Sequence, residues 1–166
     1  MPHSAGRDFE EYARARQQQL HRTAYLLCGD THRAQDLAQT TLAKLFQHWR
    51  SAKAADDIDA YAKTVLTRTY LAEQRSWRRE RSLHTPIEPA RGTGDPELRL
   101  TLLQALAEIP PKPRAMVVLR YWEDMSVEQV AALLRCSPGT VKSQCSRSLD
   151  KLRRHLAPAL MCLSDA

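Results

Sequence analysis

One stretch of the chain, residues 82–96, is poorly suited to regular secondary structure. Its sequence, SLHTPIEPARGTGDP, contains three Pro and two Gly and has no apolar period. Because Pro and Gly interrupt helices and the stretch can bury little surface, we expect a flexible linker here. The linker divides the 166-residue chain into two parts, 1–81 and 97–166, each long enough for one small domain.

Both parts show the apolar spacing of α-helices, and neither shows the alternation of a strand. In the first part, Gly29 breaks the helical pattern and Asp30 or Thr31 can cap the helix that follows. That helix places its apolar residues on one face: Ala34, Leu37, Ala38, Thr41, Leu42, Leu45, Phe46 and Trp49. The acidic turn 56–59 then favours a helix start.

The second part continues with two predicted helices, of which the later one directs Ala115, Met116, Val118, Leu119 and Trp122 inward. The sequence therefore predicts an all-α protein of two small helical domains joined by a flexible linker. The expected boundaries are 1–81, 82–96 and 97–166, and the last domain ends in a short C-terminal tail.

The charge is unevenly distributed along the chain. Its net charge is +6, and the segment 63–84 alone carries six basic and two acidic residues. A second basic stretch, Arg135–Arg154, has Asp150 as its one acidic residue. Two basic stretches on either side of a linker indicate two contacts with one polyanion; two solvated helix faces are the alternative.

Several classes of protein are disfavoured by the sequence. No run approaches the roughly 18 apolar residues of a membrane span, and the N-terminus does not resemble a secretory signal, so a cytoplasmic protein is expected. The four Cys form no C-x-x-C pair and the six His form no cluster, so we predict no metal, no cofactor and buried structural cysteines. No nucleophile or general-base constellation is evident, and the chain is interpreted as a non-enzyme.

Two helical faces before the linker have unusual compositions. On the second helix, the face opposite the apolar one is small and polar, and it suits either solvent or a partner helix. It is formed by Asp36, Gln39, Thr40, Ala43 and Gln47. The third helix ends with Arg75, Trp77, Arg78 and Arg79. Aromatic rings interleaved with Arg suit unpaired nucleic acid, although such rings also occur in cores.

A helix-turn-helix pattern follows in the second part. Ser126 and Gln129 have the spacing of a capping box, and Ser137-Pro138 predicts the start of a second helix. Gly139 lets a phosphate approach the free N–H groups at that helix end. The second helix is polar and basic on its outer face, which is typical of a DNA-reading helix; a plain helical hairpin is the alternative.

Together these motifs resemble the bacterial sigma factors of the extracytoplasmic-function (ECF) group, in particular actinobacterial members. Residues 36–39, Asp-Leu-Ala-Gln, are similar to the family run that docks on core RNA polymerase. Residues 122–126 and 137–143 are similar to the region 4 signature that reads the −35 element, and 51–79 to the part that melts the −10 element. The resemblance implies a sigma factor that directs promoter-specific transcription initiation.

The resemblance also assigns site residues and partners. Asp36, Gln39, Thr40, Ala43 and Gln47 are the expected contacts with core polymerase. The expected −10 contacts are Tyr61, Lys63, Arg68, Arg75, Trp77, Arg78 and Arg79. The expected −35 contacts are Arg135, Ser137, Thr140, Lys142, Ser143, Gln144, Ser146, Arg147 and Lys151. The implied partners are the clamp helices and flap region of core RNA polymerase, promoter DNA as duplex and single strand, and an anti-sigma factor.

Two positions depart from the family pattern. Arg68 stands where the family often has Asn, so the family's −10 preference does not transfer. Arg135 stands where the family usually has Gly, and a left-handed backbone there would cost about 1 kcal/mol. Three other functions stay open at this point: a free-standing DNA-binding regulator, a Cys- or His-dependent enzyme, and a helical adaptor that binds only protein.

Overall fold

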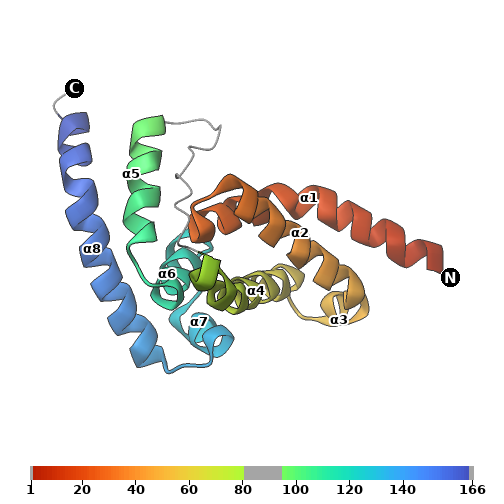
Figure 1. The fold of residues 1–166 in the computed structure, drawn as a ribbon. Helices are drawn as coiled ribbons and strands as arrows, with labels where there is room; N and C mark the ends of the chain where they lie inside the picture. Colours follow the sequence, from red (N-terminus) through yellow and green to blue (C-terminus); the bar gives the residue numbers. More distant parts are fainter. Residues whose placement is uncertain (1, 81–94, 165–166) are drawn as a thin grey trace.

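The computed structural model describes residues 2–80 and 95–164, and these residues contain helices and no strand. The first part of the chain forms α1 (Pro2–Cys28), α2 (Thr31–Gln47), α3 (Trp49–Ala54) and α4 (Ile58–Glu80). The second part forms α5 (Pro96–Ala107), α6 (Pro111–Val117), the π-helix η1 (Val118–Trp122), α7 (Val127–Leu134) and α8 (Pro138–Ser164). The predicted all-α fold is confirmed (Figure 1).

Local sequence signals determine where the helices begin. Gly29 has a φ of 70°, and Asp30 caps α2 by accepting hydrogen bonds from the backbone N–H groups of His32 and Arg33. Asp57 caps α4 in the same way, as the acidic turn predicted. Asp95 caps α5, so the helix takes up the end of the predicted linker. Residues 82–94 of that linker lie outside the described part of the chain.

The core of the first part lies between α1, α2 and α4. Leu27, Leu37, Leu45 and Leu66 are each at most 1% exposed. Phe46, which was expected on this apolar face, is 58% exposed, and that expectation is wrong. Each residue of a helix is rotated by about 100° from the last, so when Leu45 points inward the ring of Phe46 turns outward.

In the second part, α8 packs against α5, α6 and α7. The helix is 27 residues long, or about 40 Å, and it includes Pro158 within its last turns. The stretch expected as a short C-terminal tail is helical as far as Ser164, where it forms the end of α8. Figure 1 shows α5 beside the C-terminal half of α8.

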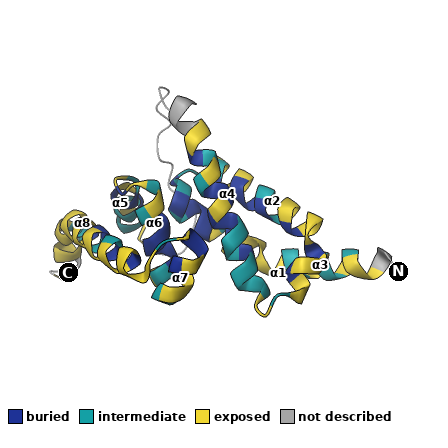
Figure 2. Ribbon diagram, turned by 90° about the horizontal axis from the view of Figure 1, so that it is seen from below, coloured by how far each residue is buried: buried dark blue, intermediate teal, exposed yellow. Residues whose placement is uncertain are grey.

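The two parts share their cores. Leu103, Ala115 and Val118 of the second part complete the core of the first, while Leu26 and Leu71 pack against the core of the second. In Figure 2 the buried residues run without a break from α4 into α6. The linker thus joins two helical units that lie in direct contact.

The π-helix changes which residues face inward. Its wider turn is marked by a backbone hydrogen bond of 3.1 Å from the N–H of Glu123 to the carbonyl of Val118. An i→i+5 turn shifts every later residue out of the 3.6-residue period. Trp122, expected to point inward, is 53% exposed, and Glu123 is buried instead.

Candidate nucleic-acid interface

The turn between α7 and α8 has the geometry that the sequence predicted. Ser126 and Gln129 form a reciprocal capping box at the start of α7. Ser137 caps α8 by accepting from the N–H of Thr140 at 3.1 Å. Between them Arg135 adopts the left-handed conformation, with a φ of 55°, which is the strained geometry expected where the family has Gly.

The expected −35 residues gather on the outside of this helix pair. Val141, Cys145, Ser148 and Leu152 of α8 are buried, and most of the positions between them are exposed. The exposed members of the set are Arg135, Ser137, Thr140, Lys142, Ser143, Ser146, Arg147 and Lys151, while Gln144 is half-buried. Hydroxyl donors therefore lie at the start of the helix, and cations lie along it.

A basic hollow of about 230 Å³ adjoins this face. Arg120, Lys142 and Arg153 line it together with Ser146, from η1 and α8. Arg120 also donates to the carbonyl of Met125 at 2.7 Å, which holds its guanidinium in place. Sequence reasoning missed Arg120 and Arg153. Helical spacing could have identified Arg153, because it follows Lys142 by eleven residues, or about three turns, and so lies on the same face of the helix.

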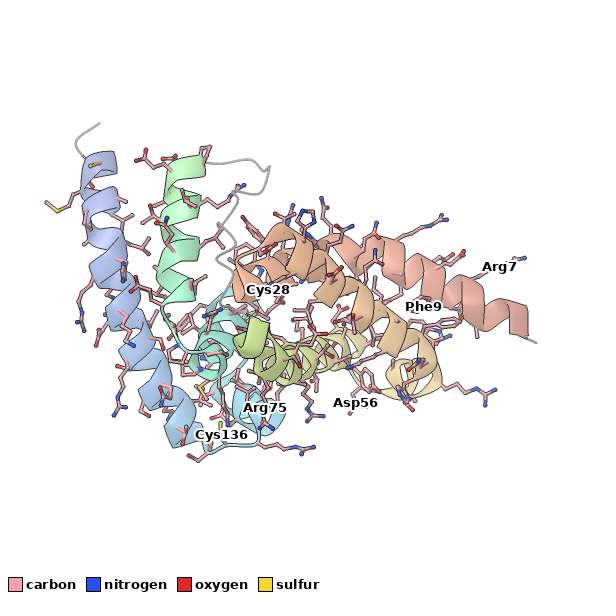
Figure 3. All side chains as sticks on the ribbon, in the orientation of Figure 1. Arg7, Phe9, Cys28, Asp56, Arg75 and Cys136 are labelled. Carbon is pink, nitrogen blue, oxygen red and sulfur yellow. The ribbon has the colours of Figure 1, made fainter. Side chains whose placement is uncertain are left out.

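The expected −10 residues of α4 do not all share one face. Tyr61, Arg68 and Arg75 are seven residues apart, so they form one stripe along the helix. The two Arg are exposed and Tyr61 is half-buried. Figure 3 shows Arg75 toward the end of α4. Trp77, Arg78 and Arg79 continue the same helix, but their side chains lie outside the described part.

Lys63 lies on a different side of α4. It is two residues from Tyr61, a rotation of about 200°, and it faces η1. Its ammonium is 3.1 Å from Oε2 of Glu123, and the two side chains are 20% and 4% exposed. The structure therefore does not bring Lys63 together with the other −10 residues.

The small polar face of α2 is exposed as a stripe. Asp36, Gln39, Ala43 and Gln47 are exposed and Thr40 is half-buried. Sequence reasoning missed Phe46, which is exposed beside Gln47 and rests against Phe9, with ring centroids 5.1 Å apart. A polar stripe with one exposed ring beside it suits a protein partner better than water alone.

A wide depression lies where α1, α3 and the turn before α4 meet. Its volume is about 540 Å³, and its lining includes Asp8, Glu11 and Asp56, with Trp49 beneath them. The indole Nε1 of Trp49 is buried without a hydrogen-bond partner among the described residues. Beside it, burial and a 3.0 Å hydrogen bond to Asp59 raise the pKa of Tyr12 above its usual value.

Comparison with known protein families identifies both parts of this arrangement. Residues 12–81 match the model of sigma-70 region 2, and residues 99–152 match the model of sigma-70 region 4. The region 2 match contains α2 and α4, and the region 4 match contains the helix-turn-helix of α7 and the start of α8. The chain belongs to the sigma-70 family.

Its relatives place this sigma factor in the ECF group. The RNA polymerase sigma-E factor of Streptomyces coelicolor is 39% identical over 158 residues, which cover 90% of this chain and 86% of the relative. The ECF sigma factor SigE of Mycolicibacterium smegmatis is 30% identical over 159 residues, covering 90% and 62%. The predicted family and its actinobacterial affinity are confirmed.

A solved structure has a similar fold. It is the sigma factor RpoE from Bartonella quintana in complex with the anti-sigma factor NepR, with a TM-score of 0.76 and 26% identity over 90% of this chain and 97% of that one. As a sigma factor, the present chain acts with core RNA polymerase and directs initiation at promoter DNA. Among its described helices, none is long and apolar enough to cross a membrane.

Proposed function

We propose that region 4 of this sigma factor reads the −35 duplex through the outer face of α8. The observation that carries the proposal is the exposure of hydroxyl and basic side chains from Ser137 to Lys151 on a helix whose N-terminus follows a capped tight turn. Donors near such a helix start reach base edges in the major groove, and cations further along hold phosphates. Arg120 and Arg153 extend the phosphate contacts beyond the predicted set.

Region 2 is proposed to bind the unpaired −10 strand along α4. The stripe of Tyr61, Arg68 and Arg75 offers one ring and two guanidinium groups, which together suit a single strand. The depression above Trp49 is proposed to take one extruded base, because it contains two aromatic rings, Tyr12 and Trp49. Glu11 and Asp56 can accept from the exocyclic amine of a base, while Asp8 pairs with Lys53. Binding of unpaired bases then offsets part of the cost of opening the duplex.

The polar stripe of α2 is proposed to dock on the clamp helices of the polymerase largest subunit. Small side chains let a partner helix approach closely, and Phe46 adds an apolar contact that is already exposed. Region 4 is proposed to meet the flap region. With both regions held by one polymerase, each promoter contact raises the effective concentration of the other.

The functional units are proposed to follow the expected boundaries, with 1–81 for the polymerase and −10 contacts and 97–166 for the −35 contact. The chemistry of RNA synthesis then belongs to the polymerase, and this sigma factor acts as a non-catalytic subunit in the cytoplasm. An anti-sigma factor is proposed as a further partner, supported by the likeness to a sigma factor solved with one.

The decisive experiment mixes the full chain with bacterial core RNA polymerase and analyses the mixture by gel filtration and run-off transcription from a promoter library. We expect a stoichiometric complex that starts transcripts at a shared pair of −35 and −10 sequences. Core polymerase that gains no promoter preference would refute the proposal. DNA binding by the free chain without polymerase binding would instead favour a free-standing regulator.

Matched variants separate the two surfaces. Asp36→Arg together with Gln39→Ala should abolish co-elution with core polymerase and leave the thermal melt unchanged. The control Glu10→Arg, at an exposed position on α1, should leave both the co-elution and the thermal melt unchanged. Lys142→Ala and Arg147→Ala should each weaken −35 binding, by about 1–3 kcal/mol where a base contact is lost. Lys112→Ala, an exposed cation on α6, is the control for charge alone.

A further inference from the structure

The basic hollow beside the proposed −35 face is lined by more than cations. Its polar lining comes from Arg120, Lys142, Ser146 and Arg153, and its apolar lining from Val127, Val141, Cys145 and Leu149. Val141 and Cys145 are buried, whereas the cations of α8 in the lining are exposed. The apolar residues therefore form the floor of the hollow and the cations form its rim. A phosphate of a DNA backbone is held by cations, so a duplex makes no use of the floor.

An aromatic ring also lines the hollow. Tyr121 of η1 is 54% exposed and belongs to the lining. The guanidinium carbon of Arg120 lies 5.5 Å from the centroid of this ring, and the hydrogen bond to the carbonyl of Met125 holds the guanidinium in place. Planar bases stack both on aromatic rings and on guanidinium planes. Tyr121 and Arg120 together thus provide a fixed stacking surface beside an apolar floor.

The charges and the size of the hollow favour a small anion. Among the described residues that line it, three are cations and none carries a carboxylate. Arg153 lies 3.6 Å from Asp150, but these side chains are 75% and 57% exposed, so the ion pair is weak. The volume of about 230 Å³ is below the roughly 300–1,000 Å³ of pockets for drug-sized ligands. The hollow therefore suits one planar base with its phosphates at the rim.

We propose that this hollow binds a purine nucleoside phosphate, with the base on the apolar floor against Tyr121 and the phosphates on the cations of the rim. A two-ring base covers more of the floor than a one-ring base. Lys142 and Ser146 also belong to the proposed −35 contacts, so the nucleotide and the −35 duplex exclude each other. This competition rests on the proposed function, whereas the site itself rests on its own lining.

Isothermal titration calorimetry on the full chain at low salt tests the site, with adenosine diphosphate and inorganic pyrophosphate as probes. Both probes carry two linked phosphates, but only the first has a base. We expect one adenosine diphosphate per chain, bound at least about fivefold more tightly than pyrophosphate, because stacking of one base contributes that factor or more. Equal affinities for the two probes, or no saturable binding of adenosine diphosphate, would overturn the site.

Two neighbouring aromatic residues give a matched pair of variants. Tyr121→Ala removes the ring of the hollow, whereas Trp122→Ala removes a ring that is 53% exposed and lies outside the lining. Tyr121→Ala should weaken adenosine diphosphate binding at least about fivefold and leave pyrophosphate binding unchanged, and Trp122→Ala should change neither. Tyr121→Phe keeps the ring and should keep the wild-type affinity. If Tyr121→Ala lacks a native circular dichroism spectrum, Tyr121→Leu replaces it with the same criteria. Unchanged adenosine diphosphate affinity without the ring would refute the stacking role of Tyr121 and with it the site.

Fluorescence anisotropy with the −35 duplex recovered from the run-off library tests the competition. Adenosine diphosphate should displace the duplex from the wild type. Tyr121→Ala should bind the duplex as the wild type does, but its displacement should need at least about fivefold more adenosine diphosphate. A duplex that stays bound at saturating nucleotide would overturn the competition. The calorimetry needs no promoter, so a chain that binds adenosine diphosphate and no −35 duplex would refute the proposed function and support the site.

Discussion

Replacing Arg114 with Met tests a buried polar contact between the two regions. Arg114, on α6, is 4% exposed, and every N–H group of its guanidinium has an acceptor. The acceptors are the carbonyls of Leu27, Ala107 and Ile109 and the hydroxyl of Tyr70, at 2.7 to 3.2 Å. Leu27 and Ala107 belong to the last turns of α1 and α5, where carbonyls have no partner within the helix.

The expected loss follows from these contacts. A hydrogen bond to a charged group contributes about 1.5–3 kcal/mol, and a buried acceptor that loses its donor costs about 1–3 kcal/mol. Met fills similar space and removes the cost of burying a cation, which offsets part of the loss. We therefore expect Arg114→Met to lower the free energy of unfolding by about 3–5 kcal/mol, a large share of the 5–15 kcal/mol of a typical domain.

The assay is equilibrium urea denaturation of the full chain, followed by circular dichroism and tryptophan fluorescence. Arg153→Met is the matched control, because that side chain is 75% exposed, and its effect should stay within about 0.5 kcal/mol. Tyr70→Phe should cost about 1.5–3 kcal/mol, since it removes the hydroxyl that accepts from the charged Arg114 guanidinium. A loss below about 1 kcal/mol for Arg114→Met would refute the reasoning that this guanidinium holds the helix ends together.

Three further predictions concern single positions. Arg135→Gly should raise the free energy of unfolding in urea denaturation by about 0.5–1 kcal/mol. The substitution removes the strain of a left-handed L-residue, and the larger entropy that Gly gains on unfolding offsets part of this stabilisation. Unchanged or lower stability would contradict the prediction. Gly139→Ala should stabilise the chain by about 0.5 kcal/mol, since a Cβ there meets only Oγ of Ser137 at 3.9 Å. The same substitution should weaken −35 binding, as measured by fluorescence anisotropy. Equal or tighter binding would count against the approach of a phosphate to this helix end. Burial raises the pKa of Cys28 to about 12. Iodoacetamide should therefore modify Cys28 at pH 8 about 1000-fold more slowly than a thiol of ordinary pKa, and the rate should increase toward pH 12. Peptide mapping should show that the exposed Cys162 reacts first.

Much of the local structure could be predicted because its causes lie close together in the sequence. Asp30, Ser126 and Ser137 cap helices through residues two or three positions away. The exposed faces of α2 and α8 follow from helical spacing alone. The predicted site residues on these faces are exposed or half-buried as that spacing requires.

The expectations that were wrong have one kind of cause. Trp122 turned outward because the π-helix interrupts the period from which its direction was predicted. Phe46 is exposed because the apolar stripe of α2 is narrower than the run of apolar residues in the sequence. In both cases the helix geometry around the residue places its side chain outside the stripe that packs on the core.

What the sequence by itself determined is the helical class, the caps, the helix-turn-helix and the composition of each exposed face. Only the tertiary structure decided that Arg114 and Glu123 are buried between the two regions and that Lys63 is covered. Their partners Leu27 and Thr23 are 87 and 100 residues away in the chain. A charged residue in a helix is normally solvated. The local sequence therefore does not distinguish such a residue from a buried one whose ion-pair partner or hydrogen-bond acceptor lies on a distant helix.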